Sequence, residues 1–326
     1  MDPTFAAALT GGLFGSALTI SGVAAPSAII GQFQFSDYHM VLTFLTASAC
    51  GAPIFLLASR SNHAQISARQ NSSFGRAGKF DGNVIGGTLL GIGMGLTGAC
   101  PGTVLVQAAA GVAGSQLLLA SGALAGVLYI PWSQSNPKTP TDPAGKHSLS
   151  EATGYSFKTV LLTYEAALLA MITAALYLAP KGRYTVHPAV GGVLIGLAQA
   201  SSVYFTKKPL GASAAYEDIG KIFWGSVRGT KMPGIQNLIF AAGVMAGARL
   251  TMQALPETAM AFAHSTGIST LRAVLGGFAL IFGARMAGGC TSGHGITGMS
   301  TLGVSSFVTV PCMFAGGILA AMLLKT

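Results

Sequence analysis

Charged side chains are scarce in this sequence. Only 8% of its 326 residues are Asp, Glu, Lys or Arg, whereas 51% are hydrophobic. A soluble globular domain carries about 25% charged residues. The composition therefore excludes an ordinary soluble domain and places the chain in a lipid bilayer.

Cysteines and acidic residues are also few, at four and nine. The cysteines are Cys50, Cys100, Cys290 and Cys312, and all of them fall in apolar or glycine-rich runs rather than in polar loops. This placement argues against an extracellular disulfide framework and favours free thiols. No nucleotide-binding motif is present, so direct use of ATP is not expected. We expect no cofactor and no resident metal.

A secretory leader and a nucleic-acid module are not indicated either. The first residues, MDPTFAAALTGG, lack a basic n-region, so we expect the first apolar run to remain as a membrane segment. The net charge of +9 comes from Lys and Arg residues in loops between apolar runs, where they set orientation. Nucleic acid is therefore not an expected partner.

Apolar runs long enough to cross the bilayer recur along the whole chain. A helix needs about 20 residues to cross roughly 30 Å of hydrocarbon. The pattern predicts an all-α integral membrane protein with about nine transmembrane helices in a single membrane domain, residues 1–326. The predicted spans are 4–25, 38–59, 82–99, 114–131, 158–179, 188–205, 234–254, 269–288 and 304–324.

Basic residues concentrate in three loops that nine spans place on one side. These are 60–80, 206–233 and the linker 132–151, which is rich in Pro, Ser and Lys and is predicted to be flexible. The positive-inside rule predicts that all three are cytoplasmic, with the N-terminus inside and the C-terminus outside. We expect a multi-pass protein of the plasma (inner) membrane.

The chain contains an internal duplication. TGGLFGSALTIS at 10–21 resembles VGGVLIGLAQAS at 190–201, which predicts repeat one at about 4–131 and repeat two at about 188–324. The linker and an odd helix, about 132–179, separate them and make the repeats inverted, which favours a shared site near the midplane. Aligning Cys100 with Cys290 superposes Gly86 on Gly276, Gly87 on Gly277, Gly93 on Gly283 and Gly98 on Gly288.

Each repeat has a predicted helix break at its cysteine. In GACPG at 98–102, Pro101 cannot continue a helix, and Gly98 and Gly102 loosen the backbone on either side. TVLVQAAAG at 103–111 then forms a short half-helix whose positive end favours an anion. GGCTSGHG at 288–295 is expected to break in the same way, with Gly289, Thr291, Gly293 and His294 beside Cys290. We predict that both thiols and both half-helix ends meet near the centre.

Other polar residues leave alternatives open. His294 and the thiols of Cys100 and Cys290 suit a soft metal such as Cu(I) or zinc, although no third sulfur or carboxylate is near. Arg285 lies inside a predicted span, so it either faces a cavity or a partner or extends to the headgroups. We expect a structural partner for Glu165. Cys50 and Cys312 are predicted to be buried packing residues, and His39, His63 and His187 to be surface residues.

The motifs GACPG and GGCTSGHG, on a duplicated chain of about nine spans, resemble those of the YeeE/YedE family of sulfur transporters. The resemblance implies an hourglass-shaped protein in which cysteines at the membrane centre contact thiosulfate in turn. It also implies a cytoplasmic sulfur-carrier protein as a partner. Some members have a further cysteine in the first segment, where SGVAAPS at 21–27 offers only Ser21 and Ser27. With the breaks, the candidate substrate-binding set is Cys100, Cys290, His294, Arg285, Gly98, Pro101, Gly102, Gly289, Thr291 and Gly293.

We therefore expect a transporter, not an enzyme, that moves thiosulfate or a related sulfur anion through the bilayer. A neutral thiol donates a weak S–H contact, and a pocket of Cys100, Cys290 and Met286 suits a soft terminal sulfur better than a sulfate oxygen. Two alternatives remain open: a membrane sulfurtransferase that forms a cysteine persulfide, and a soft-metal transporter.

Overall fold

The computed structural model describes residues 1–139, 146–178, 186–230, 232–263 and 267–324. Its named elements are helices, as the composition predicts. They are α1 (Pro3–Ile20), α2 (Pro26–Phe33), α3 (His39–Arg60), α4 (Asp81–Thr97), α5 (Thr103–Ala110), α6 (Ser115–Ser135), α7 (Leu149–Thr153), α8 (Phe157–Leu178), α9 (Pro188–Thr206), α10 (Ser213–Arg228), α11 (Gln236–Ala254), α12 (Pro256–Ala263), α13 (Thr270–Ala287), the π-helix η1 (Ser292–Gly298) and α14 (Val304–Leu323).

Within the described residues, seven helices are long and apolar enough to span a membrane: α1, α3, α6, α8, α9, α13 and α14. An eighth span results if α11 and α12, which meet at a bend of 115°, are counted as one. The predicted count of nine is not confirmed. The predicted span 82–99 corresponds to α4, which has 17 residues and is shorter than the roughly 20 residues a bilayer requires.

The stretch 206–233, predicted to be a loop, contains the helix α10. Its Gly220 packs so closely on α6 that an added Cβ would lie 2.2 Å from the carbonyl oxygen of Gly126. Tyr216, on the same helix, is buried. The acidic and basic residues of α10 interrupt its apolar pattern, so a search for long apolar runs did not predict this helix. In the predicted linker, residues 140–145 lie outside the described part of the chain, as does Lys325 at the C-terminal end.

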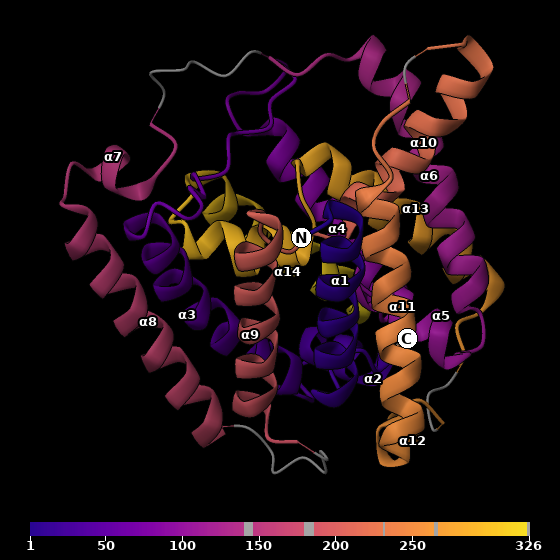
Figure 1. The fold of residues 1–326 in the computed structure, drawn as a ribbon, viewed down its shortest axis with the longest axis horizontal. Helices are drawn as coiled ribbons and strands as arrows, with labels where there is room; N and C mark the ends of the chain where they lie inside the picture. The colour runs from indigo at the N-terminus through magenta and orange to yellow at the C-terminus, as the bar shows by residue number, and fades with distance from the viewer. Residues whose placement is uncertain (140–145, 179–185, 231, 264–266, 325–326) are drawn as a thin grey trace.

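The helix contacts follow the predicted duplication. α1 packs on α11, and its counterpart α9 packs on α3. Likewise α4 packs on α14, and its counterpart α13 packs on α6, while α1–α9 and α4–α13 pair with each other. The odd helix α8 lies at the outer edge beside α3 (Figure 1). We propose on this basis that the predicted repeat boundaries are correct.

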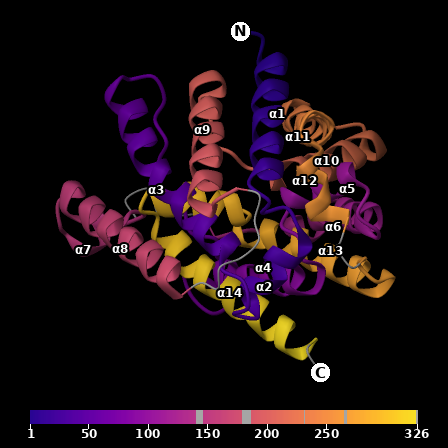
Figure 2. The same cartoon turned by 90° about the horizontal axis from the view of Figure 1, so that it is seen from below.

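The central pair, α4 and α13, runs antiparallel. An added Cβ at Gly86 would lie 2.7 Å from the carbonyl oxygen of Gly283, and one at Gly93 would lie 2.8 Å from that of Gly276. The residue numbers change in opposite directions along the two helices, which is the relation that an inverted repeat requires. Small residues allow this close backbone approach in a membrane. The start of α1 and the last turn of α14 lie at opposite edges of the molecule (Figure 2).

We predict that Gly283→Ala destabilises the protein. The new Cβ would lie 2.4 Å from the backbone nitrogen of Leu90, so α4 and α13 would have to separate. Overpacking of this kind costs about 1–3 kcal/mol. Thermal unfolding of the detergent-solubilised protein measures the effect, and Gly211→Ala, where a Cβ meets nothing within 4 Å, is the matched control. Equal melting temperatures for the two variants would contradict the close contact.

Candidate functional site

The structure has a helix break at each predicted position. α4 ends at Gly98, whose φ is +62°, and α13 ends at Gly288, whose φ is +84°. Glycine adopts this left-handed conformation without steric cost, which explains its presence at both helix ends. The first break continues as the predicted half-helix α5, whereas the second continues as the π-helix η1.

Cys100 is held at the N-terminal end of α5. The backbone N–H of Thr103 donates to its sulfur at 3.4 Å, and the N–H of Cys100 donates to Thr103 Oγ1 at 2.7 Å. Gln107 Nε2 donates to the carbonyls of Gly98 and Ala24, which ties the break to the turn after α1. The thiol thus sits where the predicted half-helix presents its free N–H groups.

Cys290 is almost fully buried in the second break. Its sulfur lies 3.3 Å from Ser292 Oγ and is also close to Ser213 of α10. Cys100 and Cys290 lie within electrostatic range of each other, and Tyr216 is close to both. The Tyr216 hydroxyl donates to the Pro101 carbonyl at 3.2 Å. The two predicted thiols therefore lie in the same region of the molecule.

A small cavity of about 30 Å³ lies between the breaks. Of the predicted site residues, Cys100, Gly102 and Thr291 line it. Ser292, Thr43 and Thr103 add hydroxyl groups, and the oxygen of Thr43 is buried with no hydrogen-bond partner in the part of the chain that the structure describes. The remaining lining is apolar: Phe14, Leu18, Val23, Met40, Phe44, Ile195 and Ile296.

Met286 does not belong to this cavity, contrary to expectation, because it packs beside Tyr129 and Ile130. Two other methionines bring sulfur to the break. The Thr291 hydroxyl contacts Met94 Sδ at 3.4 Å and Met313 Sδ at 3.6 Å. Both come from helices that pack on each other, α4 and α14, so their position depends on tertiary structure that the local sequence does not reveal.

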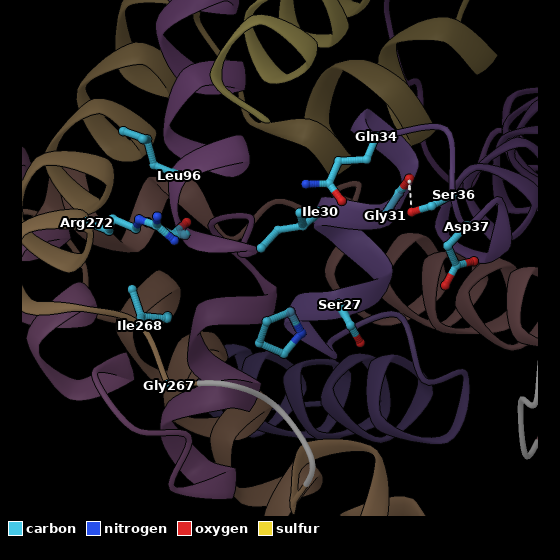
Figure 3. A pocket seen from close by; sticks show the side chains of 12 residues that line it. Ser27, Ile30, Gly31, Gln34, Ser36, Asp37, Leu96, Gly267, Ile268 and Arg272 are labelled. Atoms are coloured by element: carbon cyan, nitrogen blue, oxygen red, sulfur yellow. Dashed lines mark hydrogen bonds between the residues drawn. The ribbon is translucent and has the colours of Figure 1, made fainter. Parts of the chain in front are cut away.

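Two larger cavities lie at opposite ends of the α4–α13 pair. One, of about 480 Å³, includes Thr97 near the end of α4 and Arg272 near the start of α13. Figure 3 shows Arg272 and Asp37 on opposite sides of it. The other, of about 420 Å³, includes Ser72, just before α4, and Gly288, just after α13. Each cavity therefore reaches one of the two breaks.

We call the second of these cavities the basic vestibule. It is lined by residues 66–72 together with Lys138, Pro209, Gly288, Thr297, Gly298 and Thr301. Its lining comes from all three loops that were predicted to share one side of the membrane. This shared position agrees with the prediction.

Arg69 is a residue of the site that the sequence analysis missed. It donates to the Gly288 carbonyl. A Cβ added at Gly289 would lie 2.7 Å from its Nη1, and one at Gly293 would lie 3.0 Å from its Nη2. The guanidinium therefore covers the turn that contains Cys290. Because the predicted residues Gly289 and Gly293 have no side chain, they leave room for this guanidinium.

Asp81 holds the loop that carries Arg69. Its carboxylate accepts hydrogen bonds from the backbone N–H groups of Phe74, Arg76 and Ala77 at 2.7–3.2 Å. Desolvation raises the pKa of Asp81, but these bonds and one from Gly82 outweigh it and lower the pKa to about 2. The loop is therefore anchored at the start of α4.

Arg285 has a partner rather than extending freely to the headgroups. Its Nη2 forms an ion pair with Glu217 of α10, and its Nη1 donates to Ser213 Oγ at 3.4 Å. Lys138 Nζ donates to the Arg285 carbonyl at 3.3 Å. Glu217 was missed because α10 was predicted to be a loop.

His294 does not line the central cavity. Its Nε2 lies 3.1 Å from the Ala287 carbonyl oxygen and its Nδ1 lies 3.0 Å from Ser306 Oγ. A carbonyl only accepts, so Nε2 carries the proton and Nδ1 accepts from the serine. Both nitrogens tie η1 to neighbouring helices. No group of three His, Cys, Asp or Glu in the described residues is placed to hold a metal ion.

Two further expectations are wrong. His39, predicted to be a surface residue, is 2% exposed, and its Nε2 lies 2.6 Å from the Ser21 carbonyl oxygen. Glu165, expected to have a structural partner, has a buried Oε1 with no hydrogen-bond partner in the described part of the chain. His39 is buried by its contact with the end of α1, which a position near a predicted loop boundary does not reveal.

In the described part of the chain, seven helices are long and apolar enough to span a membrane, and α4 and α13 end at breaks that outer cavities reach. This arrangement defines a multi-pass membrane protein. The family model described as "Sulphur transport" matches residues 20–319, and the chain belongs to this family. A "Probable transporter" of Xylella fastidiosa strain Temecula1 is 26% identical over 138 residues, which are 41% of this chain and 91% of that protein. Its counterpart in strain 9a5c is 24% identical over 135 residues, with the same coverage. These relatives are less than half as long as this chain, about the size of one repeat.

We predict that Glu217→Gln and Arg285→Gln each destabilise the protein. The first leaves the partly buried Arg285 without its ion pair, and the second leaves Glu217 with Lys221 as its remaining ion-pair partner in the described residues. An unsatisfied buried group costs about 1–3 kcal/mol. The double variant should lose less than the sum of the single losses. Thermal unfolding of the three variants in detergent tests this expectation. Additive losses would show that the two side chains do not act as a pair.

Proposed function

We propose that this transporter carries thiosulfate across the plasma membrane into the cytoplasm, with Cys100 and Cys290 contacting the anion in turn. The observation that supports this most directly is the placement of the thiols. Each lies at a helix break reached by one outer cavity, and the two are close to each other. A path that joins the outer cavities would pass both sulfur atoms.

The chemistry of the breaks suits a soft anion. Thiosulfate carries two negative charges, which the N–H groups at the start of α5 favour. Its terminal sulfur is larger and more weakly hydrated than oxygen, so thiols and thioethers replace its lost water adequately. Gly102, where an added Cβ would meet nothing closer than 3.5 Å, would let the anion approach the backbone beside Pro101, whereas Pro26 packs on Gly98 and Arg69 covers Gly289. Neither Ser21 nor Ser27 lines the central cavity. Of the two thiols, Cys100 lines it, and Cys290 lies behind the lining residue Ser292, 3.3 Å from its hydroxyl.

The central cavity has to widen for transport. At about 30 Å³ it has room for about one water molecule, which is less than thiosulfate needs. The structure therefore corresponds to a closed path. The segments at the two breaks lack continuous helical hydrogen bonding, so they are the parts best able to move. We propose that the vestibule faces the cytoplasm, where a sulfur-carrier protein would collect the anion.

Replacement of the thiols tests the proposal. Cys100→Ala and Cys290→Ala should each reduce uptake of labelled thiosulfate into proteoliposomes by about tenfold or more, since a hydrogen bond to a charged group contributes about 1.5–3 kcal/mol. Cys50→Ala is the matched control, because Cys50 packs on Gly196 of α9 away from the cavity. Normal uptake by both single variants would refute the cysteine path. Release of sulfane sulfur without uptake would indicate a sulfurtransferase instead.

Competition by sulfate tests how the anion is recognised. Sulfate has the same charge and a similar shape, so helix ends attract both anions, and only the terminal sulfur distinguishes them. We expect sulfate to compete poorly with thiosulfate, and selenosulfate to compete well. Cys290→Ser should reduce this preference along with the rate, because a hydroxyl solvates oxygen better than sulfur. Equal competition by sulfate in the unmodified protein would show that the thiols do not distinguish a terminal sulfur from an oxygen.

A further inference from the structure

We propose that the basic vestibule is a second binding site, which holds a divalent oxyanion before or after it passes Cys290. The identity of the anion in the cell rests on the proposed function, but the site itself is defined by charge. Arg69 and Lys138 are its charged lining residues, and no acidic residue lines it among the residues that the structure describes.

Neither cation is neutralised by a direct partner in the described chain. Arg69 donates to the Gly288 carbonyl and Lys138 to the Arg285 carbonyl, and both acceptors are neutral. Glu217 lies within electrostatic range of Lys138, but it already pairs with Arg285 and Lys221. Two positive charges therefore face the vestibule with nothing inside it to balance them.

The vestibule also offers a free hydroxyl. Thr297 is 4% exposed and lines the cavity, and its Oγ1 has no hydrogen-bond partner among the described residues. A buried hydroxyl without a partner costs free energy, which an anion oxygen would recover by accepting its proton. This orphan donor beside two cations indicates a ligand that accepts hydrogen bonds and carries negative charge. A volume of about 420 Å³ leaves ample room for a tetrahedral oxyanion.

The opposite cavity does not share this character. It contains Arg272, but also the carboxyl group of Asp37 across from it (Figure 3). The two outer cavities therefore differ in charge, although the helices around them follow one pattern. An anion is attracted more strongly to the vestibule than to the other mouth.

The vestibule should select by charge and not by sulfur, because none of its described lining residues is a cysteine or methionine. Guanidinium, ammonium and hydroxyl groups bind sulfate and thiosulfate oxygens alike. Selection would then occur in two stages. The vestibule would concentrate divalent oxyanions, and the thiols beyond Arg69 would accept the one with a terminal sulfur.

Isothermal titration of purified Cys100→Ala/Cys290→Ala protein with sodium sulfate and sodium thiosulfate tests this site without the central thiols. We expect both anions to bind, with affinities within about threefold of each other, and Lys138→Gln in this background to weaken both by about tenfold. Arg76→Gln is the matched control, because Arg76 lies in the same loop but outside the vestibule and contacts Asn136. It should leave binding unchanged.

Two results would overturn the inference: affinities that are the same in the Lys138→Gln and Arg76→Gln variants, or binding of thiosulfate but not sulfate. Proteoliposome uptake by the unmodified protein separates this inference from the proposed function. If sulfate binding depends on Lys138 while thiosulfate is not taken up, the vestibule stands and the proposed substrate fails. If thiosulfate is taken up while anion binding is insensitive to Lys138, the proposed substrate stands and the vestibule site fails.

Discussion

The contact between the backbones of α4 and α13 determines where the whole site lies. Both helices end at a left-handed glycine, and both are followed by a cysteine two residues later. Glycines at the crossing let the two helices approach until their backbones are in direct contact. The register of this antiparallel pair therefore sets where the two breaks stand relative to each other. A larger residue at the crossing would move both thiols, not one.

A helix break inside a bilayer leaves backbone groups that lipid cannot satisfy. In this structure polar side chains meet that need. Gln107 bonds to the Gly98 carbonyl, Arg69 to that of Gly288 and His294 to that of Ala287. Several polar residues near the site are thus required to hold the breaks open, whatever passes through them. This explains why His294, a good ligand by residue type, has no nitrogen left for a substrate.

Sequence patterns predicted the features that depend on local chemistry or on repetition. Gly98 and Pro101 together favour a helix stop through local chemistry, and the alignment of Gly98 with Gly288 predicted the second stop from the first. The features that the sequence did not predict depend on contacts between segments that are distant in the chain. Arg69 and Gly288 are 219 positions apart, and no spacing rule connects them. Glu217 was missed because a helix that packs on protein rather than lipid carries charges, and the search for apolar runs rejects it. The same search accepted α4 as one of nine spans because it is apolar, although its 17 residues are fewer than the roughly 20 that a bilayer requires.

The symmetry of the helices and the difference in charge between the two outer cavities have different consequences for transport. Under the proposed function, the anion would pass two breaks that each carry a cysteine. No binding site can drive net movement by itself, because it lowers the energy of the bound anion equally for entry and exit. The net direction must then follow from the anion gradient or from removal of the anion on one side. A cationic vestibule at one mouth raises the occupancy there. It would therefore favour transfer to whatever removes the anion at that side, and would slow escape into free solution.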